Sequence, residues 1–175
     1  MYTTEGIVLK RTDVGEADSL FTLYTRDFGK MRALAQGVKK EGAKLKGHLE
    51  PFGMASVSFV IGRSGARLTH ASLLNFWEEM CLSFSKLRAA RYMADLVDAH
   101  CGEGERDSAL WEFFSEKLQI LAEMDNDRVE ECIAQFCKMF QRDLLVHLGY
   151  GDDDEKMREG EIARWRDVRY NEMYE

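Results

Sequence analysis

The chain has 175 residues, of which 45% are hydrophobic, and carries 24 Lys and Arg against 31 Asp and Glu, a formal net charge of −7. This apolar content is ordinary for a globular protein, so wholesale disorder is excluded, and the length allows one large domain or two small ones. No apolar run approaches membrane-spanning length, and the N-terminus lacks the basic and apolar regions of a signal peptide. We therefore expect a cytoplasmic protein with no membrane contact.

Charge is distributed unevenly along the chain. Residues 1–77 hold 11 Lys and Arg and 7 Asp and Glu, a net charge of +4, which leaves −11 for residues 78–175. Attraction to phosphates depends on the local field rather than on total charge. The first part is therefore a candidate nucleic-acid binder, although the chain as a whole is acidic.

Five segments of the first part have strand patterns, with glycine-containing turns between them. They are residues 5–11, 20–25, 31–36, 54–61 and 66–76. A long connection, residues 37–51, separates the third from the fourth; connections of this length are uncommon in compact domains and are often functional. Five short strands without a helical crossover predict a small antiparallel barrel. The oligonucleotide-binding (OB) barrel is the commonest five-stranded form, and strand count alone does not exclude an SH3-like barrel.

From Trp77 onward the apolar residues fall at helical spacing. The pattern predicts a helix over residues 82–101, a second that starts with Ser108 as its N-cap, and a third that residues 125–127 cap and that stops at Gly149 or Gly151. Residues 152–155 form an acidic run, and residues 158–174 have the pattern of a last, charged helix. We expect the helices to pack on the barrel through its apolar exit, formed by Leu73, Leu74, Phe76 and Trp77.

The predicted fold class is thus α+β. An N-terminal five-stranded antiparallel OB-fold barrel, residues 1–77, is followed by an α-helical domain with an acidic tail, residues 78–175.

The connection of residues 37–51 is the strongest candidate site. Ammonium groups suit phosphates because they are point charges without a fixed geometry, and glycines let the backbone follow a ligand. The same pattern also fits a solvated loop that lysines keep soluble. Its lysines are Lys39, Lys40, Lys44 and Lys46, and its glycines are Gly37, Gly42 and Gly47. Further bases that would extend a DNA-binding surface are Arg11, Lys30, Arg32, Arg63 and Arg67, although each alone is more often a turn or strand-edge charge.

Aromatic side chains stack on bases in OB barrels. Tyr24, Phe28, Phe52 and Phe59 are available, but a small barrel needs aromatic residues in its core, which favours burial of Phe52 and Phe59. Phe28, in a hairpin beside Lys30, is the better candidate for base stacking.

Metal and catalytic chemistry are not indicated. The cysteines Cys81, Cys101, Cys132 and Cys137 include no C-x-x-C pair, so reduced thiols packed between helices are favoured over a zinc site. No motif of a hydrolase, a nucleotide-binding loop or a metalloprotease is present. We expect no enzyme activity, no bound metal and no cofactor.

The amino-acid sequence of several segments resembles that of the bacterial RecO family of recombination mediators. The segments are TEGIVLKR (4–11), DVGEAD (13–18), LYTRDFGK (23–30), AQGVKK (35–40), GHLEPF (47–52) and LGYG (148–151). They run in order through nearly all of the first 150 residues, although they are ordinary residues rather than a catalytic signature.

The resemblance implies an N-terminal OB barrel and a C-terminal helical domain. It also implies binding of single- and double-stranded DNA, annealing of complementary strands, and loading of RecA onto strands coated by single-strand-binding protein, together with RecR, near the nucleoid. Many members continue past Tyr150 with a cysteine zinc motif, whereas this chain continues with Gly151 and four acids. We therefore expect a short form without the zinc-binding segment, which puts in doubt any partner contact made by that segment.

Two other functions remain open at this point. In the first, the chain is an adaptor whose acidic helices bind proteins while the barrel binds no DNA. In the second, it is an RNA-binding OB module, since phosphate contacts do not distinguish DNA from RNA. Steep weakening of binding with salt would separate a phosphate binder from an adaptor.

Overall fold

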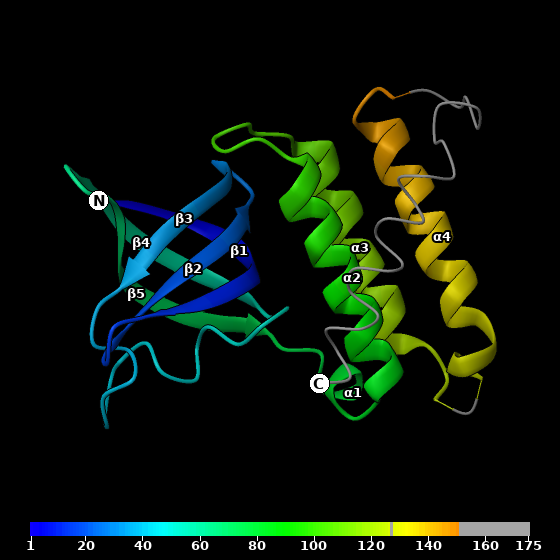
Figure 1. The fold of residues 1–175 in the computed structure, drawn as a ribbon, viewed down its shortest axis with the longest axis horizontal. Helices are drawn as coiled ribbons and strands as arrows, with labels where there is room; N and C mark the ends of the chain where they lie inside the picture. The colour runs from blue at the N-terminus through cyan, green and yellow to red at the C-terminus, as the bar shows by residue number, and fades with distance from the viewer. Residues whose placement is uncertain (127, 151–175) are drawn as a thin grey trace. The chain divides into compact units, whose positions relative to one another are not determined.

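The computed structural model describes residues 1–126 and 128–150. Five strands come first and four helices follow (Figure 1). The strands are β1 (Tyr2–Val14), β2 (Asp18–Thr25), β3 (Gly29–Ala35), β4 (Met54–Gly62) and β5 (Gly65–Asn75). The helices are α1 (Glu78–Cys81), α2 (Phe84–His100), α3 (Ser108–Glu123) and α4 (Val129–His147). All five predicted strands are present, while the four-residue helix α1 was not predicted.

The strands close into a barrel in the order β1-β2-β3-β5-β4, with β4 also paired to β1. This five-stranded closed barrel confirms the OB prediction. The prediction of a purely antiparallel barrel is wrong, because β3 and β5 pair in parallel at Ala33↔Ala66 and Leu34↔Arg67. Strand directions cannot alternate all the way around a ring with an odd number of strands, so a closed five-stranded barrel must contain a parallel pair.

The long strand β1 lets the sheet close on itself. Its residues Tyr2–Ile7 pair with β4, and its residues Gly6–Val14 pair with β2. The register shifts between Val8 and Lys10, and such irregularities bend a strand as barrel closure requires. The interior is filled by aliphatic and aromatic side chains, among them Phe21, Leu23, Ala33, Val57, Phe59 and Leu68.

The connection between β3 and β4, which we call the lysine loop (residues 36–53), contains neither strand nor helix. Its backbone makes a series of tight turns, in which the amides of Lys40, Ala43 and Lys46 donate to the carbonyls three residues earlier. Val38, Leu45 and Leu49 are buried in the barrel core. The loop is therefore anchored by its apolar residues, which leaves its polar residues on the outside.

Helices α2 and α3 begin at polar caps. Ser83 caps α2 by accepting from the amide of Lys86, and Asp107 caps α3 by accepting from the amide of Leu110. The predicted cap Ser108 is instead the first residue of α3. The ammonium group of Lys86 is buried and donates to the carbonyls of Ala122 and Met124, which satisfies backbone acceptors at the end of α3.

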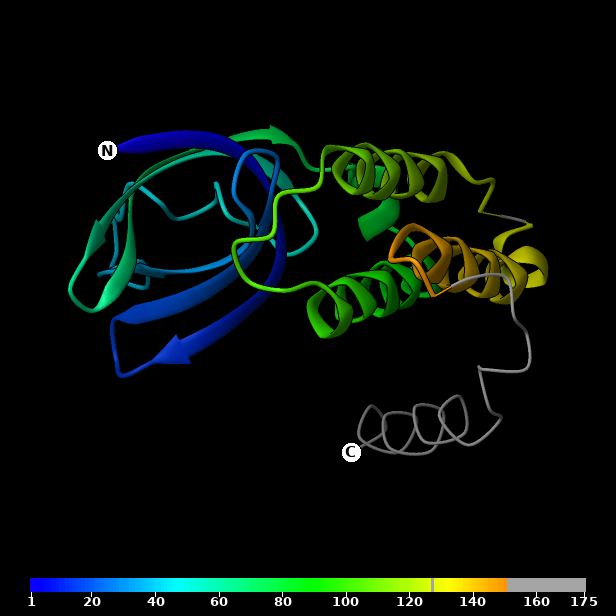
Figure 2. The same ribbon diagram turned by 90° about the horizontal axis from the view of Figure 1, so that it is seen from above.

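Tyr24, which the sequence pointed to only as one of the aromatic residues available for base stacking, contacts the helical region. Tyr24 of β2 is buried, with its ring 6.5 Å from that of Trp111 and 6.4 Å from that of Phe114, both in α3. At the predicted apolar exit, Trp77 is buried and its indole nitrogen donates to Gln119 at 2.5 Å, but Leu74 is half exposed. The expectation was thus right for Trp77 and wrong for Leu74. Figure 2 shows the segment between α2 and α3 running toward the strands.

The described residues divide into two units, one that ends at Gln141 and a second that begins at Arg142. In the second unit the amide of Gly149, which has φ +81°, donates to the carbonyl of Val146 just after α4 ends. This agrees with the prediction that Gly149 stops the helix. The predicted last helix and the acidic run lie outside the described residues. The division of the chain at Trp77 stays a prediction.

Candidate nucleic-acid interface

Three lysines of the lysine loop are open to solvent. Lys40, Lys44 and Lys46 are exposed, and no described residue forms an ion pair or hydrogen bond with their ammonium groups. They lie between the buried anchors Val38, Leu45 and Leu49, so the fold of the loop holds them out from the barrel. Such unpaired cations can exchange small counterions for phosphates.

Lys39 differs from the other three because it is already paired. Its ammonium group lies 3.0 Å from a carboxylate oxygen of Asp13 and donates to the carbonyl of Gly15 at 3.2 Å. The hydrogen bond from Lys39 is the main cause that lowers the pKa of Asp13, with help from the hydroxyl of Ser19. The lysine loop is thereby joined to the hairpin between β1 and β2.

Arg11 belongs to the same group of side chains. Its Nε donates to the hydroxyl of Ser19 at 3.2 Å and lies 3.7 Å from Asp13, while its guanidinium carbon lies 5.8 Å from the centre of the Phe21 ring. A cation over an aromatic face is held electrostatically by the ring. Arg11 is therefore fixed beside the lysine loop. From the sequence, Arg11 is predicted to be part of a DNA-binding surface only because of its charge.

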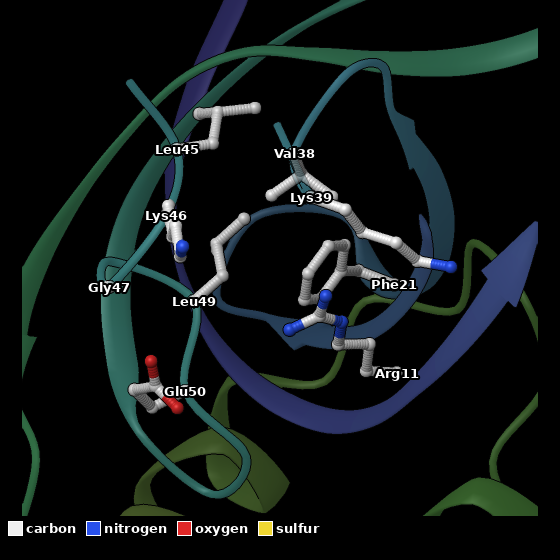
Figure 3. A pocket seen from close by; sticks show the side chains of 9 residues that line it. All are labelled: Arg11, Phe21, Val38, Lys39, Leu45, Lys46, Gly47, Leu49 and Glu50. Atoms are coloured by element: carbon white, nitrogen blue, oxygen red, sulfur yellow. The ribbon is translucent and has the colours of Figure 1, made fainter. Parts of the chain in front are cut away.

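A pocket of about 240 Å³ lies between the lysine loop and the barrel wall (Figure 3). Phe21, Val38, Leu45 and Leu49 supply its apolar lining, and Arg11, Lys39, Lys46 and Glu50 supply its charged groups. Sequence reasoning missed the apolar lining. The feature of the sequence that could have predicted this lining is the spacing of Leu45 and Leu49 within an otherwise polar loop.

Arg67 also reaches this region. It stands opposite Leu34 in the parallel pair, and its guanidinium donates to the side chain of Gln36, the first residue of the lysine loop, at 3.2 Å. Arg63 is exposed in the turn between β4 and β5. Arg11, Arg67 and the lysines are far apart in the sequence, and the fold of the barrel brings them to one region.

Lys30 is not part of this region, which corrects the prediction that it extends the surface. It is 7% exposed, its ammonium group donates to the backbone carbonyl of Asp98 at 2.5 Å, and it lies 3.4 Å from the carboxylate of Asp98. A buried ammonium group bonded in this way has no access to a nucleic-acid phosphate. Arg32, although exposed, forms an ion pair with Glu103 at 2.8 Å. Both cations face the helical segment.

Phe28, the candidate for base stacking, is half-buried in an aromatic cluster. Its ring makes edge contacts with Tyr2 and Phe59, at 5.6 and 5.2 Å between centroids. Phe52 and Phe59 are buried, which confirms that part of the prediction. Base stacking by Phe28 stays a prediction.

Within residues 1–126 and 128–150, no three His, Cys, Asp or Glu side chains are grouped as metal ligands. All four cysteines are free thiols. In the same ranges, no helix combines the length and apolar character needed to cross a bilayer.

Comparison with known proteins gives one consistent result. Residues 1–77 match the model of the family described as Recombination protein O N terminal. The chain is 29% identical to DNA repair protein RecO of Syntrophomonas wolfei over 147 residues, which are 84% of this chain and 56% of that protein. It is 32% identical to DNA repair protein RecO of Acaryochloris marina over 132 residues, 75% of this chain and 45% of that protein. The chain therefore spans about half the length of the curated relatives it matches.

Proposed function

Because the chain belongs to the RecO family of DNA repair proteins, we propose that it acts as a recombination mediator whose barrel binds single- and double-stranded DNA through the lysine loop. The observation that carries the proposal is the exposure of Lys40, Lys44 and Lys46 on a loop anchored in the barrel core. Oligonucleotides bind OB barrels at their loops and strand faces, and phosphates supply most of the affinity.

The chemistry of the loop favours annealing over sequence reading. Lysine ammonium groups neutralise phosphates without the paired donors that recognise a base edge. Two complementary strands repel each other, and a surface that neutralises both and grips neither set of bases lowers that barrier. Arg11 and Arg67 extend the cationic surface beside the loop, and Arg63 is a further exposed cation in the turn between β4 and β5.

The helical region has a different part in this proposal. Residues 78–175 carry a net charge of −11, so within a Debye length they repel a DNA strand. We assign them to bracing the barrel and to contacts with proteins. By resemblance, the partners are RecR, single-strand-binding protein and RecA, and the place of work is the nucleoid. No catalytic residue, metal or cofactor takes part.

Fluorescence-anisotropy titration tests the proposal. Labelled single-stranded DNA, duplex DNA and RNA of equal length are titrated at two salt concentrations, and annealing of complementary oligonucleotides is timed with and without the protein. We expect binding to both DNA forms, faster annealing, and loss of both in a variant with Lys39, Lys40, Lys44 and Lys46 replaced by Glu. Salt-independent behaviour or no binding would favour a protein-interaction adaptor. Preference for RNA would favour an RNA-binding module.

A further inference from the structure

The carboxylate of Asp13 is held by a set of donors that would suit a phosphate. The hydroxyl of Ser19 donates to Asp13 Oδ1 at 3.0 Å, Lys39 Nζ lies 3.0 Å from Oδ2, and Arg11 Nε lies 3.7 Å from Oδ1. Two cations and one hydroxyl around a single anionic group are the contacts by which proteins hold phosphate oxygens.

These donors are fixed independently of the carboxylate. Ser19 is buried, and its oxygen accepts from Arg11 Nε, which holds the guanidinium in place beside Phe21. The backbone around Lys39 is bonded to the same hairpin, because the amide of Lys39 donates to the carbonyl of Ala17 at 3.0 Å and the amide of Gly37 donates to the side chain of Asp18 at 2.7 Å. The site therefore persists when Asp13 leaves it.

Asp13 itself is free to leave. Its side chain is 63% exposed, so rotation of the side chain places the carboxylate in water without disturbing the core. Its ion pairs are exposed ones, which are individually worth little. While the carboxylate of Asp13 is paired with Lys39 and Arg11, these two side chains are not free to bind another anion.

We propose that Arg11, Ser19 and Lys39 form a phosphate subsite, which Asp13 occupies in the free protein and which a backbone phosphate of the nucleic acid takes over in the complex. Asp13 is then an internal competitor that weakens binding and makes it easier to reverse. The inference rests on the proposed DNA binding of the lysine loop and adds to it the place of one phosphate. Exchange of one anion for another leaves the charge of the subsite balanced.

The test compares Asp13→Asn with Glu16→Gln. Both substitutions remove one negative charge from the same hairpin, but the exposed Glu16 has no contact with Arg11 or Lys39. Asp13→Asn should tighten binding to single-stranded DNA about three- to tenfold and steepen the salt dependence by about 0.7–1.4, as one or two freed cations meet phosphates. Glu16→Gln should change affinity less than twofold. In a chain that also carries Lys39→Gln and Arg11→Gln, Asp13→Asn should bring no gain.

The parent chain gives a second measurement that needs no substitution. The pKa of Asp13, followed by the carbon-13 signal of its carboxyl group, should rise on DNA binding by more than that of Glu16, because the carboxylate loses the hydrogen bond from Lys39 that lowers its pKa.

The outcomes separate this inference from the proposed function. If the parent binds DNA through the lysine loop, but Asp13→Asn matches Glu16→Gln or the two pKa values rise equally, the subsite is wrong and the proposed function stands. If the parent binds no DNA at low salt, both are wrong.

Discussion

Strand β3 separates two groups of cations that differ in what surrounds them. At its start, Lys30 and Arg32 are paired with Asp98 and Glu103 of the helical segment. Past its end, Lys40, Lys44 and Lys46 extend into solvent. The same residue types thus join two parts of the protein in one place and remain available to a polyanion in the other. The partner of a cation, and not its type, decides which role it has.

The largest effect is expected from removing the buried cation at the start of β3. In Lys30→Met, the carboxylate of Asp98 keeps its position but loses its ammonium partner, and we expect a loss of about 3 kcal/mol in the free energy of unfolding, the low end for breaking a buried pair because Asp98 partly reaches water. Urea denaturation measures this. The matched variant Arg32→Gln, which breaks an exposed pair, should cost about 1 kcal/mol or less. Equal costs for the two variants would contradict the distinction between them.

A second pair of variants compares the backbone at the start of β3 with the backbone of the lysine loop. Gly29 and Gly42 both have positive φ, +61° and +74°. A Cβ at Gly29 would lie 1.9 Å from the carbonyl oxygen of Glu105, whereas a Cβ at Gly42 meets nothing within 4 Å. Gly42→Ala should therefore cost only the left-handed conformation, about 1 kcal/mol, and Gly29→Ala more than about 2 kcal/mol. Thermal unfolding of both proteins checks the order, and a smaller loss for Gly29→Ala would mean that the segment after α2 does not press on the barrel.

The smallest effect concerns thiol reactivity. Cys101 lies at the end of α2, and burial raises its pKa to about 11, partly opposed by Lys30. The thiolate is the reactive form, so maleimide labelling of Cys101 should be slow at pH 8, increase as pH approaches 11, and lag behind the exposed Cys132. Peptide mass spectrometry follows each site. DNA bound at the lysine loop should leave the rate at Cys101 unchanged, and a large change would mean that the two places are coupled.

The sequence predicts the strands well because each carries its own pattern. The alternation in β4 and the glycine turns are local, and the lysine loop stands out by length and charge. Closure of the barrel is different, since the parallel contact of Ala33 with Ala66 joins segments that no local pattern relates. The presence of a parallel pair, but not its position, could have been predicted, because a closed barrel with an odd number of strands must contain one.

The candidate site was predicted in part for the same reason. Charge and glycine content indicated the lysine loop, but the neighbours of each base are set by the fold. Lys30 meets Asp98, a residue 68 positions away, and Lys39 of the lysine loop meets Asp13 in the hairpin between β1 and β2. Grouping nine of the eleven bases of residues 1–77 into one surface therefore included a lysine that is buried, and it missed the carboxylate that competes for Lys39.

The central claim is that Lys40, Lys44 and Lys46 contact DNA phosphates, and the salt dependence of binding tests it most directly. The affinity for one single-stranded oligonucleotide is measured over a series of salt concentrations for the parent and for two variants of equal charge. One variant replaces Lys40, Lys44 and Lys46 by Gln, and the other replaces three exposed bases of the helical region, Arg91, Arg128 and Lys138, by Gln. We predict that the loop variant loses about 2 from the slope of log affinity against log salt, about 0.7 for each phosphate contact, while the helical variant keeps the slope of the parent. Equal slopes for the loop variant and the parent would contradict the claim.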